Sequence, residues 1–288
     1  MKRFISAWLD RGKAAARGDA GGSGDASAIG VASGSGDAAA IGAAAVPGSP
    51  AATDAGPLCA LPERLSLSQA GRVLVFAPHP DDETIGCGGA LALLAQAGVP
   101  VRVVLVSDGA GAGGLPEGAA AVRQQEFAAA LRQLGVADHA MLGFPDGGLS
   151  LQAPLLQAIQ DQVDAYAPSW IFAPARADLH RDHRVVAQAV RVAALANLGV
   201  QRLCEYETWG PLPVTHVLDI GAVLATKMGA LAQHRTALAC GDYLEAATGL
   251  ARYRGLLLGT AAAAYAEGFV CSDRASRFAW RRAWGEAL

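Results

Sequence analysis

Residues 73–83 read VLVFAPHPDDE, and this stretch decides the fold of the chain. Its first five residues are apolar without a break, which is typical of a strand buried on both faces of a parallel sheet. The next six form a polar loop with one histidine and three consecutive acidic residues, and a segment rich in Ala, Gly and Leu follows. A buried strand that turns through a polar loop into a helix is the building unit of α/β folds.

Further strand–helix units of the same kind follow along the chain. Apolar runs predict strands at 101–107, 140–143, 170–173, 203–208 and 214–220. Helical periodicity predicts helices near 88–97, 119–134, 153–165, 182–197, 227–234 and 243–264. This alternation predicts a largely parallel sheet with helices on both faces, in one domain at residues 61–288.

The first 60 residues differ from the rest in composition. Residues 1–17 carry five basic side chains against one acidic one, and Phe4 and Trp8 repeat at helical spacing. We interpret them as a short basic amphipathic segment, which fits either weak contact with an anionic membrane surface or a frayed terminus. Residues 18–60 are nearly all Ala, Gly, Ser, Asp and Pro, so they predict a disordered linker.

The overall composition excludes several classes of protein. The 288 residues are 52% hydrophobic with a formal net charge of −3, so no nucleic-acid partner is expected. Apolar runs are too short and too interrupted to predict a membrane span. The five cysteines show no CxxC spacing, which argues against a disulfide framework or a cysteine zinc site. We therefore expect a reducing, cytoplasmic location.

Two polar loops stand out at predicted strand ends, where open parallel sheets bind their ligands. His79 and Asp82 are three residues apart at the mouth of one helix, and His180 and His183 have the same spacing at another. Two imidazoles and one carboxylate drawn from these loops would leave an open coordination position, as in hydrolytic metal sites. Zinc in such a site acidifies a water molecule.

Asp81 is the second carboxylate of the first loop, and it is not needed as a metal ligand. Because adjacent side chains diverge, we expect Asp81 to lie beside the water and to act as general base. The alternative for Asp81, and the preferred interpretation for Glu83, is stabilisation of the helix N-terminus. His180 is available to assist amide hydrolysis by stabilising the oxyanion or protonating the leaving amine.

Three further polar residues are candidates to bind a sugar substrate: Arg123, Asp146 and Asp108. Arg123 has an alternative interpretation as a surface ion pair with Glu126, three residues along the same helix. Asp146 is followed by two glycines, so it also fits a simple turn.

The combined motifs closely resemble the PIG-L/LmbE-like N-acetylglucosaminyl deacetylase superfamily. They are His79-Pro80-Asp81-Asp82-Glu83 and, about a hundred residues later, His180-Arg181-Asp182-His183, within a resemblance that runs from about Gly71 to Phe269. The resemblance implies a Rossmann-like three-layer fold and one Zn²⁺ per chain. It implies that His79, Asp82 and His183 hold the metal and that Asp81 is the general base.

The same resemblance implies roles for the second motif and for a later histidine. His180 would act on the oxyanion or the leaving amine, tuned by Asp182, and His234 would lie on the wall of the substrate crevice. The alternative for His234 and Lys227, which are seven residues apart, is a solvated helix face. The expected reaction is removal of the N-acetyl group from a GlcNAc-type sugar or glycoconjugate. The chain departs from the family pattern at Arg181 and at the residues after His234, positions that we expect to influence substrate choice.

Rival functions use the same residues less well. A non-catalytic saccharide-binding protein with this fold remains an alternative. A dinucleotide-dependent oxidoreductase would use the glycine loop 109–114, but Leu115-Pro116 interrupts it before the helix. A Ser/His/Asp hydrolase would need a G-x-S-x-G turn after a strand, and the sequence has none. Iron in place of zinc would leave Asp81 without a task.

Overall fold

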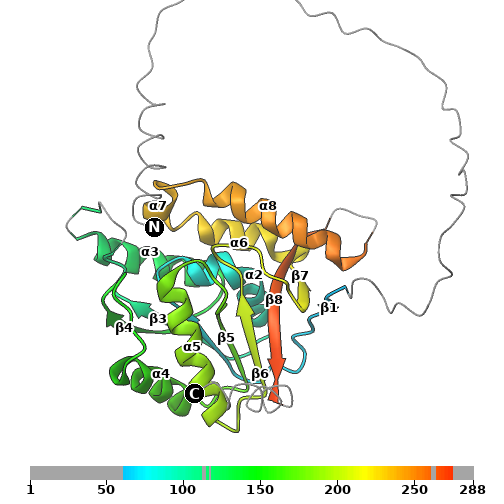
Figure 1. The fold of residues 1–288 in the computed structure, drawn as a ribbon. Helices are drawn as coiled ribbons and strands as arrows, with labels where there is room; N and C mark the ends of the chain where they lie inside the picture. Colours follow the sequence, from blue (N-terminus) through cyan, green and yellow to red (C-terminus); the bar gives the residue numbers. More distant parts are fainter. Residues whose placement is uncertain (1–60, 112–114, 117, 261–263, 275–288) are drawn as a thin grey trace, which may run out of the picture. The chain divides into compact units, whose positions relative to one another are not determined.

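One mixed sheet forms the centre of the part of the chain that the structure describes (Figure 1). The structure is a computed structural model that describes residues 61–111, 115–116, 118–260 and 264–274. The predicted segments 1–17 and 18–60 lie outside these residues. Eight strands follow the order β1-β7-β8-β6-β5-β2-β3-β4 across the sheet.

The bounds of the elements agree with most of the predicted ranges. The strands are β1 (Glu63–Arg64), β2 (Val73–Ala77), β3 (Val101–Ser107), β4 (Asp138–Phe144), β5 (Trp170–Pro174), β6 (Arg202–Tyr206), β7 (His216–Asp219) and β8 (Ala266–Asp273). The helices are α2 (Asp82–Gln96), α3 (Ala119–Gln133), α4 (Ala153–Tyr166), α5 (Arg181–Ala196), α6 (Leu224–Leu231), α7 (Arg235–Leu238) and α8 (Tyr243–Gly255). Short 3₁₀ turns lie at η1 (Gly221–Val223) and η2 (Leu256–Leu258).

The sheet is mostly parallel, as the alternation of strands and helices predicts. Strand β2 pairs in parallel with β3 and with β5, and parallel pairing continues from β3 to β4 and from β5 to β6. The exception is β8, which runs antiparallel between β6 and β7. The sequence analysis did not predict β8 and extended the preceding helix to residue 264, whereas α8 ends at Gly255.

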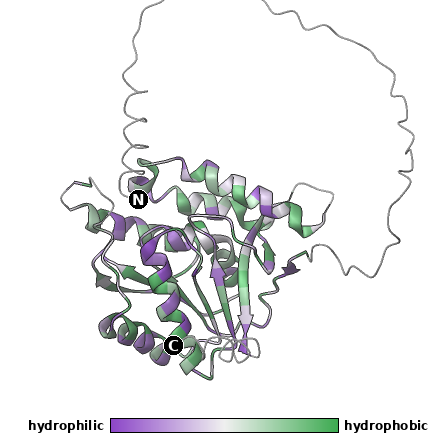
Figure 2. Ribbon diagram, viewed as in Figure 1, coloured by the Kyte–Doolittle hydropathy of each residue, from purple (hydrophilic) through white to green (hydrophobic). Residues whose placement is uncertain are grey.

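Helices cover both faces of the sheet, so the fold has three layers. Successive residues of β2 point to opposite faces: Val73 and Val75 join one buried cluster with residues of α2, α3, α6 and α8. Leu74 and Phe76 join a second cluster with residues of α4 and α5. Figure 2 shows hydrophobic and hydrophilic residues alternating along α4 and α5. Among the residues that the structure describes, no helix combines the length and the apolar character that a membrane crossing requires.

Helix α2 packs unusually closely against β6. The ring of Tyr206 occupies the space where a side chain on Gly86 would lie, because a Cβ there would meet a ring carbon at 2.1 Å. The Tyr206 hydroxyl donates a hydrogen bond of 2.7 Å to the carbonyl oxygen of Phe76 in β2. A residue without a side chain is therefore needed at position 86 for the strand and the helix to approach.

Two buried charged residues, Lys227 and Glu267, form hydrogen bonds with the backbone at a break in α2. The backbone of Cys87 is not helical, with φ −143° and ψ 23°. Beyond the break, the Glu267 carboxylate accepts hydrogen bonds from the backbone N–H of Gly89 and of the following residue, at 2.7 and 2.9 Å. Lys227 donates to Glu267 at 2.6 Å and to the carbonyl oxygen of Ile85 at 2.8 Å. Lys227 and Glu267 thus satisfy the backbone groups that the break exposes.

Candidate active site

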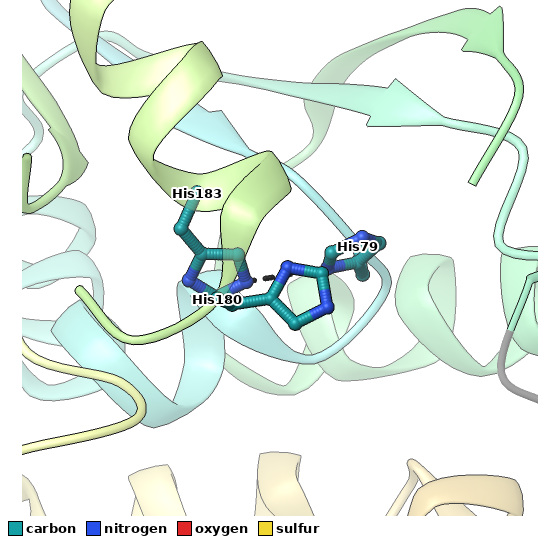
Figure 3. A group of neighbouring side chains, drawn as sticks. All are labelled: His79, His180 and His183. Atoms are coloured by element: carbon teal, nitrogen blue, oxygen red, sulfur yellow. Dashed lines mark hydrogen bonds between the residues drawn. The ribbon is translucent and has the colours of Figure 1, made fainter. Parts of the chain in front are cut away.

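The two motif loops meet at the carboxyl ends of β2 and β5, which are neighbours in the sheet. Figure 3 shows the imidazoles of His79, His180 and His183 gathered at this edge, with His180 and His183 at the start of α5. His79 Nδ1 lies 3.2 Å from His183 Nε2, although the two residues are 104 positions apart. The predicted convergence of the two loops is therefore confirmed.

Three donor atoms lie at nearly equal distances from one another. Asp82 Oδ2 is 3.2 Å from His79 Nδ1 and 3.1 Å from His183 Nε2, and the two nitrogens are 3.2 Å apart. Ligand atoms bonded at about 2.0–2.1 Å to a tetrahedral zinc ion lie about 3.3 Å apart. The spacing and the mixture of nitrogen and oxygen donors therefore fit one divalent cation with a free coordination position.

Carboxylates lie behind the two imidazoles on the side away from these donors. Asp178 Oδ2 is 3.2 Å from His183 Nδ1. His79 Nε2 is 3.1 Å from Asp146 Oδ1 and 3.4 Å from Asp182 Oδ2. Histidines that bind metals usually donate their second N–H to such a carboxylate, which holds the ring in place. The sequence analysis gave no role to Asp178, because its contact with His183 forms only when the loop folds against α5.

Two other groups of residues share His79. The sets His79–His180–His183 and His79–Asp146–Asp182 each bring their donor atoms within 4.8 Å of one another. These separations are looser than those around Asp82. In addition, His180 Nδ1 accepts a backbone hydrogen bond at 3.2 Å and Asp182 Oδ2 accepts one from Gly147 at 2.8 Å. The set with Asp82 is therefore the best candidate for a metal site in the described part of the chain.

The charges inside this metal site compensate one another. Burial alone would raise the pKa of Asp82, but His183 and His79 outweigh it and hold that pKa well below its ordinary value. Burial alone would lower the pKa of His183, yet the carboxylates of Asp82 and Asp178 raise it to about 9. A carboxylate between two imidazoles is thus stabilised in its charged form, which is the form that binds a cation.

Asp81 lines a cavity. Its φ of 128° lies in a region that residues with a side chain rarely adopt, so the backbone is strained here. Its carboxylate lies 3.7 Å from Arg123 Nη2. Burial, with a smaller contribution from the charge of Asp82, raises the pKa of Asp81 to about 7. A partly buried carboxylate on a strained backbone beside a cavity is the arrangement expected for a group that accepts a proton.

His180 begins helix α5 and also lines the cavity. Its Nδ1 accepts a hydrogen bond from the backbone N–H of Asp182, and so the side chain caps the helix. Burial and the two neighbouring imidazoles lower the pKa of His180. The Asp182 carboxylate faces His79 and Gly147, so its closest contacts are not with the ring that it was predicted to tune.

The cavity has a volume of about 180 Å³ and opens beside the metal site. Its wall includes four residues that the sequence analysis assigned to catalysis or substrate binding: Asp81, Arg123, Asp146 and His180. It also includes residues that the sequence analysis missed, notably Trp209, Thr236, Cys240 and Tyr243. Trp209 and Tyr243 pack edge to face with ring centroids 6.1 Å apart. These residues follow β6 or lie near α7 and α8, so only the folded chain brings them to the motifs.

Two predicted substrate contacts are not on the cavity wall. Asp108 Oδ1 accepts hydrogen bonds from the backbone N–H of Ala110 and Asp146, so Asp108 holds the loop that carries Asp146. His234 is buried, and its Nε2 lies 3.2 Å from the hydroxyl oxygen of Thr84. Both side chains therefore lie behind the wall. There Asp108 binds backbone N–H groups, and His234 contacts a buried hydroxyl group.

Arg123 and Glu126 do not form the surface ion pair that their spacing suggested as an alternative. Both are buried. Arg123 Nη1 donates to the carbonyl oxygen of Gly109 at 2.7 Å and lies 3.4 Å from Asp146 Oδ2. Glu126 instead accepts from the backbone N–H of Thr236. Lys227 is likewise buried, at the break of α2, and does not lie on the solvated helix face that was its alternative interpretation.

Comparisons with known proteins agree on one family. Residues 74–194 match the family described as PIG-L: GlcNAc-PI de-N-acetylase. The uncharacterized deacetylase YaiS of Escherichia coli is 32% identical over 143 residues, which cover 47% of this chain and 73% of that protein. The probable N-acetyl-alpha-D-glucosaminyl L-malate deacetylase 2 of Bacillus subtilis is 31% identical over 184 residues, which cover 57% and 82% of the two chains.

A solved structure supports the same relationship. The N,N'-diacetylchitobiose deacetylase of Pyrococcus horikoshii, in complex with an inhibitor, is similar with a TM-score of 0.62 and 25% sequence identity. The match covers 72% of this chain and 85% of that protein. The similar proteins named here are all described as deacetylases.

Proposed function

Because this chain belongs to the PIG-L/LmbE-like deacetylase family, we propose that it hydrolyses the N-acetyl group of a GlcNAc-type sugar or glycoconjugate. The products would be acetate and a sugar with a free amine. The observation that carries the proposal is the grouping of His79, Asp82 and His183 around one point, with Asp81 on the adjoining cavity wall.

His79 Nδ1, Asp82 Oδ2 and His183 Nε2 would hold a divalent cation, for which zinc is our proposal. When bound, the cation supplies a positive charge that polarises the amide carbonyl and makes a water molecule more acidic. The neighbouring carboxylates Asp178 and Asp146 would hold the two imidazoles in the orientation that the cation requires.

Asp81 would accept the proton of the attacking water. Its carboxylate is partly buried on the cavity wall, 3.7 Å from Arg123, and would be held close to the reacting atoms. The water oxygen adds to the carbonyl carbon, and the C–N bond then breaks. The proton taken from water passes to the departing nitrogen, so that amide and water give acetate and amine.

His180 would donate a hydrogen bond to the oxyanion that forms during the reaction. Its Nδ1 already accepts from the Asp182 backbone N–H, so a neutral ring carries its proton on Nε2. A fixed N–H donor on the cavity wall suits the stabilisation of developing negative charge. Protonation of the leaving amine remains the alternative role, and it would require the positively charged ring.

Arg123 and Asp146 would bind the hydroxyl groups of the sugar. Both line the cavity, and the 3.4 Å contact between them holds the two side chains in place. Trp209 and Tyr243 add an aromatic part to the same wall. A polar pair beside aromatic rings is typical of a site that binds a sugar ring through both its hydroxyl groups and its apolar face.

The proposal can be tested by measuring bound metal and the release of primary amine together. We expect the purified full chain to contain one zinc ion and to release amine from N-acetylated sugars. A chelator should abolish the release, and added zinc should restore it. A series of GlcNAc derivatives, with N-acetylgalactosamine as the epimer control, would define the sugar.

Each outcome of this experiment has a clear meaning. Release of acetate and amine in equal amounts would support the hydrolase. Saccharide binding without release by the zinc-loaded protein would identify the non-catalytic alternative. Full activity after complete removal of metal would contradict the metal-dependent mechanism.

A further inference from the structure

Two cysteines that do not line the cavity lie directly opposite each other in the sheet. Cys204 in β6 is the register partner of Cys271 in the antiparallel strand β8. Their sulfur atoms are 3.2 Å apart, although the residues are 67 positions apart in the chain. Opposite residues of antiparallel strands have Cα atoms about 4.5–5.5 Å apart, which lies within the range that disulfides span. A bond would require the sulfur atoms to approach by only about 1 Å.

The two thiols have different surroundings. Cys204 is fully buried, whereas Cys271 is only partly buried. The hydrogen bond with Cys204 and the nearby His216 lower the pKa of Cys271 to about 6. Burial raises the pKa of Cys204 well above its ordinary value. A partly exposed cysteine with a lowered pKa beside a buried thiol is the arrangement of a reactive cysteine and its resolving partner.

We propose that Cys204 and Cys271 form a reversible redox site that reacts with hydroperoxides and closes a disulfide between β6 and β8. The site is separate from the cavity, because neither cysteine lies on the cavity wall. The proposal does not depend on the deacetylase function, since it uses no residue of the metal site.

The chemistry balances with one hydroperoxide per pair of thiols. The Cys271 thiolate attacks an oxygen of the O–O bond, which breaks to give a sulfenic acid and an alcohol, or water when the oxidant is hydrogen peroxide. The Cys204 thiol then displaces water from the Cys271 sulfur, and the S–S bond forms. Two thiols are oxidised by two electrons while the peroxide is reduced, and a dithiol reductant reverses the change.

The bond would join strands that both support α2. Tyr206 in β6 packs against Gly86, and Glu267 in β8 accepts hydrogen bonds from the broken part of the helix. A disulfide that closes a long loop restricts the unfolded chain. A loop of this length corresponds to about 4 kcal/mol, so for a domain of this size we expect oxidation to raise the Tm by about 10 °C.

The test begins with the reduced wild-type full chain. It is treated with hydrogen peroxide, its remaining thiols are alkylated, and the digested protein is analysed by mass spectrometry. We expect a peptide pair linked through Cys204 and Cys271, with the loss of two hydrogen atoms, while Cys240 is alkylated. Dithiothreitol should restore both thiols. The Tm of the oxidised protein is measured before and after this reduction.

Three variants separate the roles of the thiols. In Cys204→Ser, Cys271 should stop at the sulfenic acid, which dimedone labels. In Cys271→Ser, Cys204 should stay reduced because it is buried. Cys240→Ser is the matched control, because Cys240 is exposed and lies in neither β6 nor β8, and this variant should form the linked pair as wild type does.

The wild-type measurement alone tests whether the disulfide forms, even if a variant fails to fold. Alkylation of both Cys204 and Cys271 at a peroxide concentration that oxidises Cys240 would overturn the proposal. So would a linkage of either cysteine to any other residue in place of the pair. Dimedone labelling of Cys240 but not of Cys271 in a folded Cys204→Ser protein would disprove the order of the two steps.

Discussion

The two loops that meet at the candidate metal site begin their helices in different ways. At α5, His180 has ordinary extended backbone and its own side chain caps the helix. At α2, Asp81 has a strained φ of 128° and makes no capping hydrogen bond with its side chain. The same three-residue spacing of motif residues, His79 with Asp82 and His180 with His183, is therefore supported once by local structure and once by contacts from outside the segment.

The support for α2 comes from parts of the chain far away in sequence. Tyr206 packs where Gly86 has no side chain, and Glu267 and Lys227 satisfy the backbone at the break. Helix α5 instead has a continuous buried stripe and unbroken helical backbone. The comparison teaches that the positions of Asp81 and Asp82 depend on tertiary contacts, whereas those of His180 and His183 depend mainly on their own helix.

The largest effect is expected from removal of a ligand on either side. His183→Ala and His79→Ala should lose the bound metal and lower turnover more than about 10³-fold, because both loops hold the same cation. Metal content per chain and amine release measure these effects. Asp138→Asn, in an exposed ion pair with Arg102, is the control and should keep both properties. Retention of metal by His183→Ala would remove α5 from the metal site.

Asp81→Asn should separate catalysis from metal binding. We expect turnover to fall about 10²–10⁴-fold because the proton acceptor is lost. Metal content should stay at the wild-type value because Asp82, not Asp81, lies between the two imidazoles. The measurements are kcat and metal per chain in the same preparation. Near-normal turnover would show that another group accepts the proton.

Glu267→Ala should show how strongly α2 depends on distant support. Removal of one partner of a buried ion pair costs about 3–5 kcal/mol, here with two backbone N–H groups left unpaired. Urea unfolding measures the loss, and Asp138→Ala is the control, with an expected cost below about 1 kcal/mol. A loss as small as that of the control would mean that α2 tolerates its break without Glu267.

The variants His180→Ala and His180→Asn separate the role of His180 as the cap of α5 from its proposed catalytic role. Both should lower turnover about 10²-fold with the metal retained. Only the alanine variant should lose about 1 kcal/mol of stability, because asparagine also caps helices. Chemical unfolding and kcat are measured for both. Loss of metal in the asparagine variant would instead make His180 a ligand.

The smallest effect concerns the strain at Asp81. Asp81→Gly should raise the free energy of unfolding by about 1 kcal/mol, because glycine adopts positive φ without strain. The matching change on the other loop, His180→Gly, should lower stability slightly, because it removes a cap. Unfolding of both proteins with metal bound tests the comparison. A destabilised Asp81→Gly protein would show that the Asp81 side chain stabilises the loop.

Some of the fold and of the site could be predicted because the signals are local. The apolar run before His79 predicted a buried strand, and periodic alanines and valines predicted α5. Strand ends on one edge of a parallel sheet come together in any such fold, so the meeting of His79 with His183 followed from the pattern. The metal-ligand and general-base roles stay predictions that the variants above will test.

Other features could not be read from the pattern. Strand β8 carries Glu267 and Gly268 within its apolar residues, so its periodicity is weak, and it inserts between β6 and β7 without a signal in the sequence. Asp108 and His234 are polar residues suited to bind a substrate, but in the fold their side chains bind other groups behind the cavity wall. The pairing of Cys204 with Cys271 also depends on this insertion.

The amino-acid sequence alone determined which chemical groups this protein has, at which spacing, and on which kind of strand–helix unit, because period and polarity act over a few residues. The tertiary structure decided which of these groups face the cavity and which support its wall. It also decided how a strained aspartate and a broken helix are held in place. These outcomes depend on buried contacts between residues a hundred or more positions apart, whose energies arise only when the chain is packed.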